Sequence, residues 1–283
     1  EGMDLLDAYE RWTSEFKWIH GVTPMSNFLH LVLAEIAYFA VIFGLRAIVS
    51  PTGPQVADAT STSGKKTKTL SDRLLQLALC THNALLCILS AAMFCGAGYE
   101  AFKRSRTDGM RWMFCEEVER KAEGGIYFWT YIYYLSKFQE FIDTFFKVIK
   151  GKPLDFLHVY HHAVVALMCW NWLQFSQSLQ TIALMFNTFV HIVMYYYYAL
   201  TAVAPPPWWK KYITALQIIQ FQGSFLLSVP FWYIQTVEGW MEGREACAGS
   251  SAMVFNACFN LSLLLLFINF SNRTYKSASK KDK

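Results

Sequence analysis

The sequence has 283 residues, of which 54% are hydrophobic, 17% aromatic and 16% charged, and its net charge is +4. Soluble globular domains carry about 25% charged residues, so composition excludes an ordinary soluble domain. We expect an all-α polytopic membrane protein that binds membrane lipid and no nucleic acid.

Seven apolar runs follow one another along the chain, each close to the ~20 residues that cross the hydrocarbon of a bilayer. They predict one membrane domain over residues 1–283, with transmembrane helices at 28–49, 75–98, 126–149, 155–173, 179–203, 208–234 and 249–270 and a basic tail at 271–283. Polar residues interrupt the third to sixth runs, so these are the spans in which a site is expected.

Basic residues gather in the tail and in alternate connections, which is the pattern of the cytosolic side of a membrane. The tail carries Arg273 and four lysines, whereas the N-terminal segment is acidic. An odd number of spans then places the N-terminus in the lumen and the C-terminus in the cytosol. Lys280 and Lys281 form a terminal dilysine signal for retrieval to the endoplasmic reticulum, or else simply anchor the last span.

Two of the seven cysteines fall in loops on the predicted lumenal side, Cys115 in the second loop and Cys247 in the sixth. The other five lie within spans, where cysteine behaves as a small hydrophobic residue. Because the lumen is oxidising, we hypothesise a disulfide between Cys115 and Cys247.

The third run carries four polar residues on one helical stripe. Lys137, Glu140, Asp143 and Thr144 are spaced i, i+3, i+6 and i+7. Opposite charges at i and i+3 neutralise one another, so a charge pair that fixes helix packing is one interpretation. A functional site is the other, because a histidine-rich run follows.

The fourth run contains three histidines within five residues, His158, His161 and His162. Positions i, i+3 and i+4 share one face of a helix. Ionisable side chains at membrane depth rarely face lipid. The pattern therefore predicts a cavity lined by protein.

The fifth and sixth runs add further polar faces at helical spacing, made by Asn187, His191, Tyr195, Tyr198, Thr214, Gln217 and Gln220. In membranes such residues often only hold helices together. At 1.5 Å per residue, however, the main polar groups of the four spans lie about 9 to 18 Å from their cytosolic ends. This common level favours a polar chamber that opens to the cytosol.

Four segments, in order, resemble the signature boxes of the ELO family of fatty-acid elongases, most closely its plant, algal and fungal-type members. They are Lys137-Phe-Gln-Glu140-Phe-Ile-Asp143-Thr144, His158-Val-Tyr-His161-His162, Asn187-Thr-Phe-Val-His191-Ile-Val-Met194-Tyr195-Tyr-Tyr197-Tyr198 and Thr214-Ala-Leu-Gln217-Ile-Ile-Gln220. No signature position is substituted.

The resemblance implies seven helices, six of them in an inverted barrel around an acyl tunnel. It also implies condensation of a long-chain acyl-CoA with malonyl-CoA, to give a 3-oxoacyl-CoA two carbons longer, CO2 and CoA, in the endoplasmic reticulum. No cofactor or metal is expected. Expected partners are a second copy of the chain and the reductases and dehydratase of the elongation cycle.

Roles for single residues follow from the same resemblance and from imidazole chemistry. His161 is the expected nucleophile. His158 and His162 are expected to orient it, to stabilise the thioester oxyanion or to move protons. His191 is expected to assist decarboxylation or to stabilise the enolate. Supporting positions are Lys137, Glu140, Asp143, Thr144, Asn187, Tyr195, Tyr198, Gln217 and Gln220. Candidates to bind the CoA phosphates are Lys147, Lys150, Lys152, Lys210, Lys211 and Arg273.

The apolar halves of the spans are expected to line the tunnel, and bulky residues such as Phe231, Trp232 or Phe255 to set its depth. A di-iron desaturase or hydroxylase is one alternative, but it needs about eight imidazoles, and the chain has seven histidines. A seven-helix transporter or receptor is another. It calls for helix breaks near the midplane, and Pro230 is the single proline found in a late span.

Overall fold

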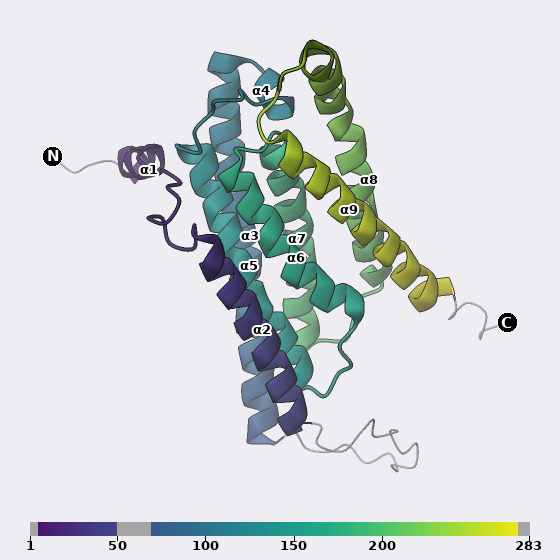
Figure 1. Ribbon diagram of the computed structural model, residues 1–283. Helices are drawn as coiled ribbons and strands as arrows, with labels where there is room; N and C mark the ends of the chain where they lie inside the picture. Colours follow the sequence, from purple (N-terminus) through teal and green to yellow (C-terminus); the bar gives the residue numbers. More distant parts are fainter. Residues whose placement is uncertain (1–4, 50–68, 277–283) are drawn as a thin grey trace.

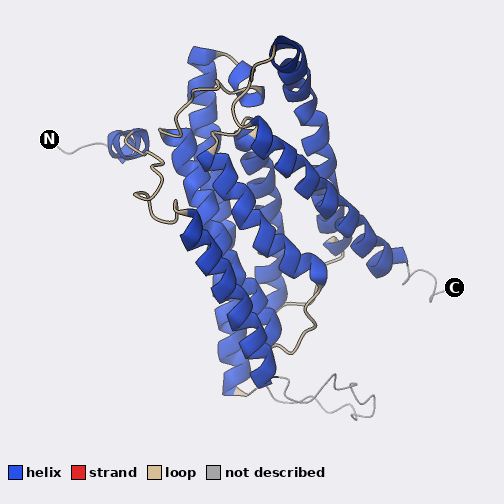
Figure 2. Cartoon of the chain, viewed as in Figure 1, coloured by secondary structure: helices blue, strands red, loops and turns tan. Residues whose placement is uncertain are grey.

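The computed structural model describes residues 5–49 and 69–276, which form an elongated bundle of helices (Figure 1). The helices are α1 (Leu5–Ser14), α2 (Phe28–Val49), α3 (Leu70–Asp108), α4 (Arg111–Phe114), α5 (Gly125–Ile149), α6 (Phe156–Gln174), α7 (Gln180–Val203), α8 (Lys210–Ile234) and α9 (Ser250–Ser271). Figure 2 shows helix and loop but no strand over the described residues. The prediction of an all-α fold is confirmed.

Each predicted apolar run lies within or nearly coincides with one helix, and the largest difference is at α3. The run was expected at 75–98, but the helix extends from Leu70 to Asp108. It begins early because Thr69 forms a capping box, in which the Asp72 backbone N–H donates to the Thr69 hydroxyl and the Thr69 N–H to the Asp72 carboxylate. It ends at Gly109, whose φ of 72° suits glycine.

Five of the described helical segments are long and apolar enough to cross a membrane: α2, α3, α7, Lys210–Glu242 and Ser250–Tyr275. This supports a multi-pass membrane protein. The two remaining long helices, α5 and α6, carry the charged stripe and the three histidines, and they are not among these five segments.

Six helices contact one another in a closed order, α3 with α7, α7 with α8, α8 with α9, α9 with α6, α6 with α5, and α5 with α3. Helix α2 packs outside this ring, against α5 and α6. Close approach of α3 and α5 depends on Gly96, because a Cβ there would overlap the Trp129 indole. The largest apolar cluster contains Tyr133 and Trp172, whose rings stack at 5.7 Å.

The two ends of the bundle differ in chemistry. At one, which we call the disulfide end, the structure joins Cys115 to Cys247, the pair proposed from the sequence. Arg104 makes two hydrogen bonds of 2.6 and 2.7 Å to the Glu116 carboxylate beside this bond. At the other, the lysine end, α5 ends at Ile149 and α8 begins at Lys210. Lys280 and Lys281 lie outside the described residues.

Candidate functional site

A cavity of about 660 Å³ opens at the lysine end between the helices of the ring. Its lining includes all three histidines of α6 and His191 of α7. The other predicted site residues that line it are Glu140, Asp143, Lys147, Lys150, Lys152, Asn187, Tyr195, Tyr198, Lys210, Gln217 and Gln220. The polar faces of four helices thus meet in one chamber.

Glu140 connects the charged stripe of α5 to the histidine of α7. Its Oε1 accepts a hydrogen bond of 2.7 Å from Lys137 Nζ and lies 3.6 Å from His191 Nδ1. Lys137 is fully buried, and its ammonium lies 3.9 Å from the centre of the Tyr133 ring. A lysine at this depth needs such a partner, since an unpaired buried charge costs about 3 to 5 kcal/mol.

Asp143, the next carboxylate on the stripe, bridges α3 and α7. Its Oδ1 lies 2.8 Å from His82 Nε2, and its Oδ2 accepts a hydrogen bond of 2.8 Å from the Tyr195 hydroxyl. His82 comes from the apolar part of α3 and is 8% exposed. Both carboxylate oxygens are therefore fixed, which holds Tyr195 in the wall of the chamber.

Thr144, the last member of the stripe, lies behind the chamber wall, between α2 and α6. Its Oγ1 is 3.0 Å from the Tyr38 hydroxyl and 2.9 Å from His158 Nε2. The ring of His158 is in turn 4.5 Å from that of His162. Hydrogen bonding thus reaches from a helix outside the ring to a histidine of the chamber.

A second, narrow cavity of about 70 Å³ continues from the chamber towards the disulfide end. The two cavities share four lining residues: His161, Asn187, Gln220 and Phe221. Asn187 Nδ2 donates to Gln220 Oε1 at 3.4 Å, and the Tyr133 hydroxyl donates to Asn187 Oδ1 at 2.7 Å. The junction is therefore a collar of hydrogen-bonded amides with His161 on its rim.

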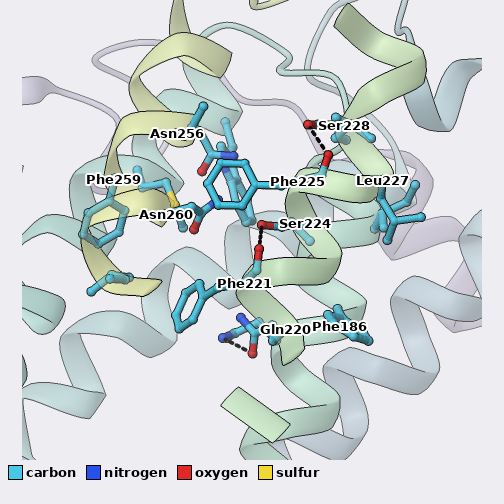
Figure 3. A pocket seen from close by; sticks show the side chains of 18 of the residues that line it. Phe186, Gln220, Phe221, Ser224, Phe225, Leu227, Ser228, Asn256, Phe259 and Asn260 are labelled. Carbon is cyan, nitrogen blue, oxygen red and sulfur yellow. Dashed lines mark hydrogen bonds between the residues drawn. The ribbon is translucent and has the colours of Figure 1, made fainter. Parts of the chain in front are cut away.

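The narrow cavity is less apolar than the sequence suggested. Figure 3 shows Asn256 and Asn260 of α9 facing it, with Ser224 and Ser228 on α8. Phe, Leu and Met side chains line it as expected, but Asn256 Oδ1 is buried with no hydrogen-bond partner among the described residues. The lining is therefore mixed, because α8 and α9 each add polar side chains to the apolar ones.

Several predicted residues lie away from the cavities. Lys137 and Thr144 stand behind the wall and act on Glu140 and His158. Lys211 and Arg273 do not line the chamber, unlike Lys210, and both are exposed. Successive helical residues are about 100° apart, so adjacent lysines cannot both face one opening.

The residues expected from the sequence to set the depth of an acyl tunnel do not line the narrow cavity. Phe231 is fully buried in a cluster with Leu179, Met253 and the two bridged cysteines. Leu179 and Met253, not Phe231, line the narrow cavity. Trp232 packs against the same cluster, and Phe255 packs against the main core.

Comparison with known proteins gives the family. The chain matches the GNS1/SUR4 (ELO) family over residues 23–283. It belongs to the ELO family. It is 33% identical to fatty acid elongase sre1 of Dictyostelium discoideum, over 98% of this chain and 94% of that protein. It is 35% identical to fatty acid elongase A of Dictyostelium discoideum over 93% and 89% of the two chains, and 34% identical to putative fatty acid elongase 1 of Schizosaccharomyces pombe over 99% and 82%. These relatives support a role in fatty-acid elongation.

The ELO signature boxes do not include two residues that the structure places against the site, Tyr38 and His82. His82 carried a signal: measured from the start of its predicted span, it lies about 10 Å deep, at the level of the other polar groups. Tyr38 carried none, because one tyrosine in an apolar helix is common and its partner on α5 depends on tertiary packing.

Proposed function

We propose that this ELO-family protein condenses a long-chain acyl-CoA with malonyl-CoA, giving a 3-oxoacyl-CoA two carbons longer, CO2 and CoA. The observation that carries the proposal is the position of His161 on the collar between the two cavities. An acyl chain in the narrow cavity and CoA in the wide chamber would bring the thioester to this collar. A nucleophile is needed at that point.

The reaction proceeds through an acyl-histidine. The unprotonated ring nitrogen of His161 attacks the thioester carbonyl, the C–S bond breaks, and the CoA thiolate takes up the proton that the ring releases. Malonyl-CoA then loses CO2, and the electron pair of the broken C–C bond becomes an enolate. The enolate carbon attacks the acyl-imidazole, the C–N bond breaks, and the ring of His161 takes up a proton.

The neighbouring groups stabilise charge during these steps. Asn187, Gln217 and Gln220 line the chamber and can donate side-chain N–H groups to carbonyl oxygens that become negative. His191 is the group that assists decarboxylation, held by Glu140, which Lys137 in turn fixes. His158 and His162 orient the substrate carbonyl and move protons. Tyr195 and Tyr198 complete the wall.

CoA phosphates bind at the lysine end through Lys150, Lys152 and Lys210. Lys147 lines the same opening, but its Nζ bonds the Asp155 carboxylate at 2.5 Å, so it serves mainly to hold the turn after α5. No cofactor or metal takes part in the proposed chemistry.

The same proposal extends to the architecture. Seven helices cross the endoplasmic reticulum membrane, and the six of the closed ring form an inverted barrel around the acyl tunnel. The disulfide end is lumenal, and the lysine end and C-terminus are cytosolic. Support comes from the lysines at one opening and a disulfide at the other end, since the lumen is oxidising. The chain forms homo-oligomers and works with the reductases and dehydratase of the elongation cycle.

The test uses purified full-length protein with radiolabelled malonyl-CoA and a series of acyl-CoAs. We expect labelled 3-oxoacyl-CoA and, with acyl-CoA alone, a mass increase of one acyl group on the peptide containing His161. His161→Ala should abolish both, while the exposed His20→Ala should change neither. An adduct on another residue would overturn the role of His161. Absence of condensation with every acyl-CoA, or stoichiometric iron in active protein, would overturn the proposed reaction.

A further inference from the structure

Three buried side chains from three helices form one hydrogen-bonded chain. The Tyr38 hydroxyl of α2 lies 3.0 Å from Thr144 Oγ1 of α5, which lies 2.9 Å from His158 Nε2 of α6. Tyr38 is 2% exposed and Thr144 is fully buried. Solvent therefore does not compete for these hydrogen bonds.

The donor and acceptor of each of these two hydrogen bonds follow from counting the hydroxyl and imidazole protons that are available. If the Tyr38 O–H donates to Thr144, the Thr144 O–H is free to donate to His158 Nε2 and every hydroxyl proton is used. In the reverse direction His158 donates to Thr144 and Thr144 to Tyr38. The Tyr38 proton would then be buried without an acceptor, at a cost of about 1 to 3 kcal/mol.

The surroundings of Tyr38 offer that proton no other acceptor among the described residues. Its ring stacks on Phe141 at 4.2 Å and packs against Phe39 and Phe145. Glu35 is one turn away on the same helix, but both of its carboxylate oxygens are without a hydrogen-bond partner, so Glu35 does not take the proton. The first direction is therefore preferred.

We infer that Tyr38 is a positioning residue, which acts through Thr144 to hold His158 in the tautomer with its proton on Nδ1. With Nε2 occupied as an acceptor, the ring presents an N–H donor to a ligand in the chamber. A neutral imidazole of fixed tautomer is suited to donate to the thioester oxygen as negative charge develops there. The expected effect on catalysis rests on the proposed condensation. The assignment of the His158 tautomer rests only on the hydrogen bonds.

The first test reads the tautomer without catalysis. Protein labelled with 15N-histidine, with His158 assigned by its loss in His158→Gln, should show an Nδ1–H, Nε2-acceptor pattern for this ring. Tyr38→Phe should convert that signal to a mixture of the two tautomers. Tyr134→Phe is the matched control, because Tyr134 is also fully buried but its hydroxyl donates to the Met25 carbonyl. A wild-type His158 protonated on Nε2 would overturn the inference, even if Tyr38→Phe fails to fold.

The second test reads turnover. We expect Tyr38→Phe to lower kcat about tenfold, the low end for removing a group that fixes a histidine tautomer, with KM for both substrates unchanged. Thr144→Ser should retain activity, and Tyr38→Phe should add no further loss to Thr144→Val, since both act through one hydroxyl. Unchanged kcat in Tyr38→Phe, or additive losses, would overturn the inference. Failure of the wild type to condense would instead refute the proposed function and leave the NMR result standing.

Discussion

Bulky substitutions of the serines on the inner face of α8 should limit the length of acyl chain that the protein accepts. Ser224 and Ser228 both line the narrow cavity, one and two helical turns beyond the collar residue Gln220. At 1.5 Å per residue they lie about 6 and 12 Å from it along the helix. A two-carbon unit of an extended chain is about 2.4 Å long, since three backbone bonds advance about 3.6 Å. The two positions are thus about 2.5 such units apart.

We therefore predict that Ser224→Phe shortens the longest accepted acyl chain by about four to six carbons more than Ser228→Phe does. The assay is condensation of radiolabelled malonyl-CoA with acyl-CoAs of increasing length by purified protein, with products separated by chain length. Leu226→Phe is the control, because this side chain is 74% exposed on the outer face of the same helix. Overpacking costs about 1 to 3 kcal/mol, so thermal melting in detergent must show that each variant is folded. If folded Ser224→Phe and Ser228→Phe both accept chains as long as the wild type does, the narrow cavity is not the acyl tunnel.

Two further predictions concern contacts outside the signature boxes. His82→Ala removes the imidazole that bonds Asp143 and should lower kcat about tenfold. The exposed His30→Ala should leave kcat unchanged. Equal activity of the two variants would show that Asp143 needs no partner on α3. Hydrogen bonds from the Tyr99 hydroxyl and then from Lys103 keep the pKa of Glu10 below its ordinary value of 4.5. A lowered pKa stabilises docked α1 above the unfolded value and loses that effect as pH falls through the folded value. The protection factor of the α1 amides, which is the ratio of the intrinsic to the observed exchange rate, should therefore fall below pH 4.5. Glu10→Gln should lower the same protection factor at neutral pH. A protection factor that neither change alters would contradict this.

The positions of the helices were predictable because a membrane span is coded locally, by about twenty apolar residues in a row. The boundaries of α3 were not, because a capping box and a glycine outside the apolar run set them. The chamber shared by four helices could also be predicted from the sequence. Spacing places His158, His161 and His162 on one face, and equal depth brings the polar groups of antiparallel helices to one level.

Contacts between helices could not be read in this way. The hydrogen bond between Tyr38 and Thr144 depends on how α2 packs against α5. The sequences of the two helices do not determine their relative orientation. Likewise, the basic residues near the opening follow from topology, so sequence does not distinguish Lys210, which lines the chamber, from Lys211, which does not. The polar lining contributed by Asn256 was missed because α9 shows no amphipathic pattern.

The bond between Cys115 and Cys247 joins residues 132 positions apart and so closes residues 115–247 into a covalent loop. All four signature boxes, residues 137–220, lie inside this loop, together with α5, α6, α7 and α8. A protease that cuts once in the 151–155 connection would therefore leave its two fragments linked. They would migrate as one species without reductant and separate only when the disulfide is reduced. The part of the chain that contains the signature boxes therefore stays linked after any single cut between these helices.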